Sequence, residues 1–358
     1  MPRITGNKGE WSELYVLLEL LADGKLYAAD ENLKKLENIF FPILKILREE
    51  KADKKSEYRI ADNEKVELFV NDTIVKTVNR DLISDYAKKL YSGIKSGSDR
   101  AFEIPEAEKA MEELDCEKIK APSTDKSDIT LQLFDINTGY KPICGFSIKS
   151  ELGNAPTLLN PGKTTNFRFE VTSMTDDLMS EINAIDTKNK ILDRVNKIYE
   201  NGELKFRKAE NKTFSENLML IDSVMEEILA ESLLLNYTGK ASTCKEVVKL
   251  LEENNPVGYP KKGYYEYKYK KFLCAVALGM TPSKAWNGKD EANGGYIVVT
   301  TNGDVLAYHI YNRDFFEQYL LDNTKFDRAS TTRYQFASVY KEDGKYYFDL
   351  NLQIRFVK

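Results

Sequence analysis

Apolar positions recur along this chain with two periods, one typical of helices and one typical of strands. Trp11, Leu14, Leu18 and Leu21 lie at helical spacing, and Gly24 suits the end of a helix predicted over residues 11–22. Pro42 is expected to kink or divide a second helix, because proline cannot donate the backbone hydrogen bond of a helix interior. The helical period predicts helices over residues 31–49, 81–94, 105–114, 177–199, 214–235, 244–253, 264–278 and 313–321.

Alternating apolar and polar residues predict strands near both ends of the chain. Short strands are expected over residues 57–60, 66–70, 73–78 and 166–172. Hairpins are expected to turn at Asn137-Thr138-Gly139, at Asn302-Gly303 and at Asp343-Gly344, since these residues tolerate the backbone of tight turns. The class is therefore α/β, of the mixed α+β kind, with a mixed β-sheet flanked by helices.

The order of these elements suggests three parts. Residues 1–175 would hold the N-terminal helices and the first long hairpin, residues 176–290 an additional helical region, and residues 291–358 the C-terminal β-hairpins. One continuous globular unit is the alternative, because no clear linker separates the parts.

Composition limits the chemistry. The 358 residues are 42% hydrophobic and 30% charged, which fits a globular protein with a core. The formal net charge of −5 argues against a protein that coats polyanions in general. A basic cleft in an acidic protein stays compatible with these values. The four cysteines are scattered, and His309 is the one histidine, so a Cys/His zinc site is not expected. His309 shares a strand face with Val305 and Ala307, where a structural histidine is the more frequent outcome.

Targeting signals are not apparent in the sequence. No apolar run approaches the length of a membrane span, and the first residues lack a basic-then-apolar pattern. Scattered cysteines in a long chain are typical of reduced thiols. We therefore expect a cytoplasmic protein with no membrane partner.

A lysine interrupts the apolar strand that follows the first long turn. Ser147, Lys149 and Glu151 alternate and so project from one face, and the hairpin register places Asp128 near residue 148. Aspartate offers hard oxygen ligands to Mg²⁺, and lysine stabilises a developing oxyanion or assists an attacking water. An ordinary salt bridge between Asp128 and Lys149 is the alternative.

This pattern resembles the PD-(D/E)xK nucleases. In that family an acid and an acid-x-lysine motif lie on adjacent strands of a mixed sheet, and a glutamate on the preceding helix often completes the site. The resemblance assigns Asp128 to the first acid, Lys149 to the lysine and Glu13, in "GEWSEL", to the helix glutamate.

One position departs from the motif. Ser147 stands where the second acid is expected, and a hydroxyl is a poor substitute for a carboxylate on Mg²⁺. Glu151, Glu13 or Asp135 could complete the metal shell, and the resemblance adds the backbone carbonyl of Ile148 as a ligand beside Asp128. A decayed site is the other explanation for the serine.

Longer strings narrow the resemblance. "KSDITLQLFD", "GFSIKSELGNAPTLLNPGKTTNFRFEV", "FDRASTTRYQFASVYKEDGKYYFDLNLQIRF" and "NKGEWSELYVLLELLADGKLY" together resemble the HpaII-type restriction endonucleases over nearly the whole chain. The resemblance implies a restriction-endonuclease-like fold and Mg²⁺-dependent hydrolysis of double-stranded DNA at the unmethylated palindrome CCGG. It also implies a homodimer as one way to cut a palindrome, and a cognate methyltransferase as a functional partner without implied contact.

Two polar segments are candidate DNA contacts, because short donors and arginines approach phosphates and base edges. Solvated loops are the alternative for both. A third segment, residues 259–272, interleaves lysines with tyrosines, which suits either phosphate contacts or a core-facing helix. The candidates in the first two segments are Asn154, Asn160, Lys163, Thr164, Thr165, Asn166, Arg328, Ser330, Thr331, Thr332 and Arg333.

Two other functions share much of this pattern. A structure-specific or repair nuclease would have the same core but cut junctions or mismatches. A DNA-binding regulator on a decayed nuclease scaffold would be consistent with Ser147. A purely structural protein would leave the motif strings unexplained.

Overall fold

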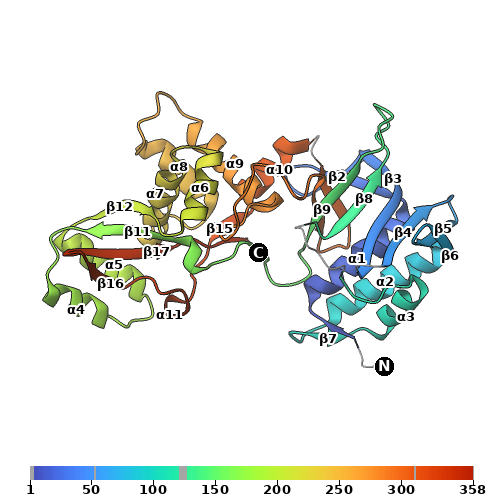
Figure 1. Cartoon of the computed structure of the whole chain (residues 1–358), viewed down its shortest axis with the longest axis horizontal. Helices are drawn as coiled ribbons and strands as arrows, with labels where there is room; N and C mark the ends of the chain where they lie inside the picture. The colour runs from blue at the N-terminus through green and yellow to red at the C-terminus, as the bar shows by residue number, and fades with distance from the viewer. Residues whose placement is uncertain (1–3, 52–53, 121–126, 310–311, 358) are drawn as a thin grey trace. The chain divides into compact units, whose positions relative to one another are not determined.

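The computed structural model describes residues 4–51, 54–120, 127–309 and 312–357 (Figure 1). The fold is of mixed α/β class, as the sequence predicts. The chain forms two compact units, each built from separate stretches of sequence. Residues 1–156 and 290–319 make the first unit, and residues 157–289 and 320–357 make the second. These boundaries are drawn differently from the three parts expected from the sequence.

The first unit is built on a nine-stranded mixed sheet with the order β2-β14-β13-β9-β8-β3-β4-β5-β6. An additional pairing of β2 with β3 closes the first six strands into a barrel-like sheet. Strand β13 runs parallel to β9, and β14 runs parallel to β2. The strands are β2 (Lys25–Ala29), β3 (Lys35–Lys51), β4 (Lys54–Ile60), β5 (Lys65–Val70), β6 (Thr73–Asn79), β8 (Ile129–Leu133), β9 (Ile143–Ser150), β13 (Gly295–Val299) and β14 (Val305–His309).

The long strand β3 corrects the helix predicted over residues 31–49. Its apolar residues lie at spacings that suit a helix as well as a strand, but β3 pairs with β2, β8 and β4 along its length. Pro42 has no N–H to donate, and its carbonyl accepts a hydrogen bond from Phe134 N at 2.8 Å. A helix would have lost a bond at Pro42, whereas the sheet accommodates it.

Helix α1 (Lys8–Asp23) is the centre of the first unit and confirms the helix predicted over residues 11–22. Asn7 and Glu10 form a capping box at its start, and Gly24, with φ 70°, ends it in the left-handed conformation. Its side chains are buried on nearly all sides, as expected of a helix packed between layers. Figure 1 shows α1 beside α2 (Arg80–Ser96), with α3 (Pro105–Glu113) beyond it.

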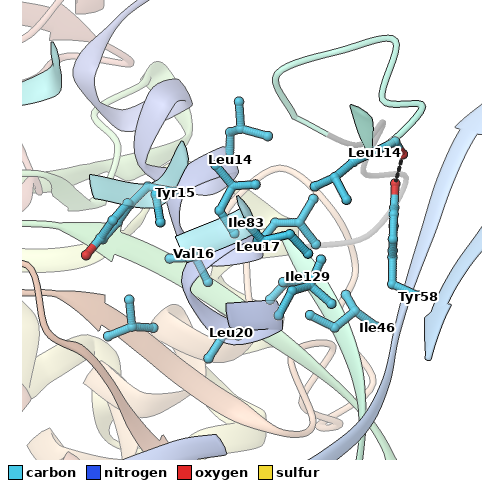
Figure 2. Close-up of a cluster of buried hydrophobic side chains, with 14 of the residues drawn as sticks. Leu14, Tyr15, Val16, Leu17, Leu20, Ile46, Tyr58, Ile83, Leu114 and Ile129 are labelled. Carbon is cyan, nitrogen blue, oxygen red and sulfur yellow. Dashed lines mark hydrogen bonds between the residues drawn. The ribbon is translucent and has the colours of Figure 1, made fainter. Parts of the chain in front are cut away.

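The core of this unit forms where α1 meets the sheet and α2. Figure 2 shows α1 side chains such as Leu17 beside Ile83 of α2 and beside Ile46 and Ile129 of the sheet. Tyr58, which is buried, donates a hydrogen bond to the carbonyl of Leu114 at 2.9 Å. Helix α10 (Arg313–Asp322) adds Phe316, whose ring lies 5.1 Å from that of Tyr296.

The second unit carries two smaller sheets and a group of helices (Figure 1). The sheet order is β12-β11-β17-β16 in one and β10-β18-β15 in the other. The strands are β10 (Thr157–Leu159), β11 (Asn166–Val171), β12 (Leu204–Ala209), β15 (Thr324–Phe326), β16 (Val339–Glu342), β17 (Lys345–Asn351) and β18 (Ile354–Phe356). The helices are α4 (Asp176–Ala184), α5 (Lys190–Asn201), α6 (Lys212–Ile221), α7 (Met225–Tyr237), α8 (Cys244–Asn254), α9 (Tyr264–Leu278) and α11 (Thr331–Tyr334).

Two long helices expected in this unit are each divided. The helix predicted over residues 177–199 breaks between α4 and α5, where the Arg194 side chain donates to the carbonyls of Asn183 and Ile185 and so satisfies the end of α4. The helix predicted over 214–235 breaks at Asp222, whose carboxylate accepts from Val224 N. Such local side-chain bonds compete with continued helix. Strand β12 was not predicted.

Several smaller expectations from the sequence can be compared directly with the structure. The turns at Asn302-Gly303 and Asp343-Gly344 lie in the hairpins β13–β14 and β16–β17, as predicted. Within residues 259–272, Tyr265 and Tyr269 of α9 are buried, which favours the core-facing alternative. All four cysteines lie in the described part of the chain, are buried and form no disulfide. The side chain of His309 lies outside what is described. In the described part of the chain, no helix is long and apolar enough to cross a membrane.

Candidate active site

The candidate site lies at the open end of the β8–β9 hairpin, where β9 continues past the start of β8. Ile129 pairs with Phe146, which is one residue out of the predicted register. Asp128, just before β8, donates its backbone N–H to the Phe146 carbonyl at 2.8 Å. The hairpin therefore fixes the backbone of Asp128 beside the second half of β9.

Three side chains form a hydrogen-bonded chain at this end. The Asp128 Oδ2 atom accepts from the backbone N–H of Ile148 at 2.7 Å and from the Ser147 hydroxyl at 3.2 Å. Lys149 Nζ donates to the same hydroxyl at 3.4 Å. Ser147 is only 4% exposed, so its hydroxyl is held between the carboxylate and the ammonium group. The serine at the motif's missing acid position thus connects the two groups that match the motif.

The Ile148 carbonyl is directed to the same side of β9. Backbone groups of alternate strand residues point the same way, and Phe146 bonds toward β8. The N–H and the carbonyl of Ile148 therefore both point toward the β8 side of the strand. Strand β8 begins at Ile129, opposite Phe146, so no residue of β8 pairs with Ile148. No described strand pairs with Ile148 on this side of β9, and its N–H is the backbone group that contacts the Asp128 carboxylate.

Glu13 reaches the same place from α1. The neighbouring Ser12 hydroxyl lies 2.8 Å from Ser150 Oγ, which ties α1 to the end of β9. Burial, and after it the charge of Asp128, raise the pKa of Glu13 to about 7 against the opposing charges of Lys120, Lys149 and Arg48. With this raised pKa, the carboxyl group is partly protonated near neutral pH, and a bound cation would stabilise its charged form.

These donors can be tested for fit to Mg²⁺. The carboxylates of Asp128 and Glu13 and the carbonyl of Ile148 are hard oxygen ligands, the type that Mg²⁺ prefers. The described residues contain no group of three or more histidine, cysteine or acidic side chains that could hold a metal. Mg²⁺ usually binds through one or two carboxylates and completes its shell with water and substrate phosphate, so this smaller donor set fits it.

The other two candidate acids have partners elsewhere. Glu151 accepts a hydrogen bond from Thr301 N at 3.2 Å, beyond the end of β13. Asp135 is buried in the turn of the β8–β9 hairpin, where it accepts from Thr138 Oγ1 at 2.6 Å. The geometry brings Glu13, and neither of these, to Asp128 and Lys149.

The candidate DNA contacts after Lys149 separate into exposed and buried residues. Asn154 belongs to the first unit, whereas the other residues of this group belong to the second. Asn154, Asn160 and Lys163 are exposed and Thr164 is half-buried. Thr165 and Asn166 are buried: Asn166 Nδ2 donates to the Tyr334 carbonyl at 3.0 Å, and its Oδ1 accepts from Asn351.

The second segment presents two arginines. Arg328 and Arg333 are exposed, and neither makes an ion pair within the described residues. Ser330 caps the short helix α11 by accepting from Arg333 N at 3.4 Å, and Asp327 is held by Gln353 at 3.2 Å. Thr331 is half-buried and Thr332 exposed. The segment is therefore fixed at both ends while its arginines stay accessible.

The sequence analysis did not predict a cleft that lies beside the candidate site. It has a volume of about 750 Å³ and is lined by Glu13, Ile148 and Lys149 together with Lys8, Arg100 and Lys120. These last three cations come from the start of α1, the segment after α2 and the segment after α3. No local motif marks them, because only the packing of α1 and α2 brings the segments together.

Comparisons with known proteins agree with one another. The family model described as HpaII restriction endonuclease matches residues 7–356. The Type II restriction enzyme HpaII of Haemophilus parainfluenzae is 42% identical over 358 residues, which covers 99% of this chain and 99% of that relative. Solved structures gave no significant match.

Proposed function

Because this chain belongs to the HpaII restriction endonuclease family and is a type II restriction enzyme, we propose that it cuts double-stranded DNA at unmethylated CCGG with Mg²⁺. The observation that carries the proposed site is the chain of contacts from Asp128 through Ser147 to Lys149, with Glu13 beside it. Carboxylates, a lysine and a backbone carbonyl at one sheet end suit hydrolysis of a phosphodiester by water.

Each residue has a distinct role in this proposal. Asp128, Glu13 and the Ile148 carbonyl would hold Mg²⁺. When bound, the metal supplies positive charge at the phosphate and lowers the pKa of a water molecule. Lys149 places its ammonium group where it can stabilise the negative charge that grows on the phosphate oxygens. No covalent intermediate with the protein is required, so hydrolysis does not depend on the single histidine.

Ser147 favours an active site over a decayed one. Its hydroxyl donates to Asp128 and accepts from Lys149, so it keeps the acid and the lysine at fixed positions. A decayed site would have no need to keep these groups hydrogen-bonded. We propose that Ser147 positions the catalytic pair while Glu13 supplies the second carboxylate.

Recognition of CCGG calls for donors to guanine O6 and N7. Arg328 and Arg333 are exposed, unpaired within the described residues and fixed in place by their neighbours, so we propose that they contact guanine in the major groove. The exposed Asn154, Asn160 and Lys163 suit phosphate contacts. A palindromic target calls for two copies of the chain, as a homodimer or in two successive events.

A plasmid digest tests the function. With Mg²⁺ we expect discrete fragments that map to CCGG and that disappear when the cytosines of the site are methylated by a cognate methyltransferase. Asp128→Asn and Lys149→Met should abolish cutting and keep DNA binding. Random nicks or junction cutting would support a repair nuclease instead. Binding of CCGG duplex without any cutting by the wild-type protein would support the decayed regulator. Normal cutting by either variant would refute the site.

A further inference from the structure

The cleft beside Lys149 carries more positive charge than the chemistry at Asp128 uses. Lys8, Arg100, Lys120 and Lys149 line it, together with the acids Glu10, Glu13 and Asp99. Glu10 is already engaged, because it closes the capping box of α1 and lies 3.5 Å from Lys120 Nζ. This leaves two cations of the outer cleft, Lys8 and Arg100, without an ion pair in the described part of the chain.

Local packing sets where these two cations lie. A side-chain atom built on Gly153 would come within 3.3 Å of Lys8 Cβ, so the turn after β9 packs closely against the start of α1. Near Arg100, the Phe102 ring covers Gly97 so closely that a Cβ there would lie 2.4 Å from it. The backbone near each cation is therefore closely packed.

The cleft is open and polar, and it is continuous with the catalytic group through Glu13, Ile148 and Lys149. Unpaired lysine and arginine side chains along an open cleft suit a polyanion better than a small neutral ligand. The established substrate is DNA, and its backbone carries one phosphate per nucleotide on each strand. The phosphates that flank the cut bond are the anions that must pass nearest to Lys149.

We propose that Lys8 and Arg100 are phosphate-binding residues that hold the strand being cut along this cleft. The proposal rests on the site at Asp128 and Lys149 and adds the residues that position DNA against it. Lys8 offers a compact charge and Arg100 a planar fork that binds two phosphate oxygens at once. Neither residue contacts the reacting atoms, so each acts by binding.

The test measures how DNA binding depends on salt. Lys8→Ala and Arg100→Ala are compared with the wild type for binding of a short CCGG duplex in EDTA, where no cutting occurs. Loss of one phosphate contact should make the slope of log K against log salt shallower by about 0.9. Lys65→Ala is the matched control, because Lys65 is an exposed lysine on β5 outside the cleft lining and its loss removes the same charge.

Cleavage kinetics separate binding from chemistry. Both variants should raise KM and keep kcat at saturating DNA, and Lys8→Arg should restore most of the salt slope. Thermal unfolding checks that the variants fold. Wild-type slopes and KM values in both folded alanine variants, or an equal change in Lys65→Ala, would overturn the proposal. The proposed catalytic site would survive that result, since it fails only if Asp128→Asn or Lys149→Met still cuts.

Discussion

The hydroxyl of Ser147 lies 3.2 Å from the carboxylate of Asp128. The residue at the position of the motif's second acid therefore contacts the residue that matches the motif's first acid. The same hydroxyl accepts from Lys149 at 3.4 Å. The carboxylate also accepts from the Ile148 N–H at 2.7 Å, so the serine is one of its two donors and is the one that connects it to the lysine. An acid at this position would instead add a third negative charge beside Asp128 and Glu13.

Ser147→Ala should lower kcat without abolishing it. Hydrogen bonds to charged groups contribute about 1.5–3 kcal/mol, which corresponds to a loss of roughly 10- to 150-fold. Ser147→Thr keeps the hydroxyl and should retain most activity. Single-turnover cleavage of a CCGG duplex measures both. A kcat for Ser147→Ala equal to that of wild type would show that the hydroxyl only packs.

Glu13→Gln should raise the Mg²⁺ concentration needed for half-maximal cleavage by about tenfold or more, because an amide binds Mg²⁺ less well than a carboxylate. Glu19→Gln is the matched control, since Glu19 lies on the same helix and burial raises its pKa as well. A Mg²⁺ titration of cleavage measures the change. An unaltered titration curve for Glu13→Gln would remove Glu13 from the metal site.

The pH dependence of metal-free stability should carry the signature of Glu13. Its pKa is raised from 4.5 to about 7 in the folded protein, so the folded state holds this proton more tightly than the unfolded state. The stabilising effect is complete below the unfolded pKa and is lost as pH rises through about 7. Added Mg²⁺ replaces the proton, so its stabilising effect should grow over the same interval. Denaturant unfolding with and without Mg²⁺ measures both trends, and Glu13→Gln should flatten them.

The sequence predicted that Asp128 and Lys149 lie close together, and the reason is local. Asp128 and Lys149 lie on one hairpin whose turn chemistry fixes the pairing to within one residue. The long strand over residues 35–51 was mistaken for a helix, because its apolar spacing suits both structures and distant strands decide between them. Arg100 and Lys120 joined the cleft only through tertiary packing, which no local pattern encodes.

Arg333→Ala should weaken specific binding of CCGG by about 1–3 kcal/mol and relax discrimination at one guanine, if that arginine contacts O6 and N7. Arg207→Ala is the control, because Arg207 is also exposed in the second unit but is paired with Glu170 at 2.9 Å. Binding to a set of single-base variants of the site measures discrimination. A uniform loss across all sequences would assign Arg333 to phosphate.

Substitutions of Asn166 and Asn160 should distinguish a structural role from a DNA contact in the segment between β10 and β11. Asn166→Ala leaves the partly buried Tyr334 carbonyl without this donor, which should cost about 1–3 kcal/mol of unfolding free energy and loosen the segment that carries Arg333. Asn160 is exposed, so Asn160→Ala should leave stability unchanged and weaken DNA binding. Denaturant unfolding and duplex binding are measured on both variants. Equal free energies of unfolding for Asn166→Ala and Asn160→Ala would show that the Asn166 amide does not support this segment.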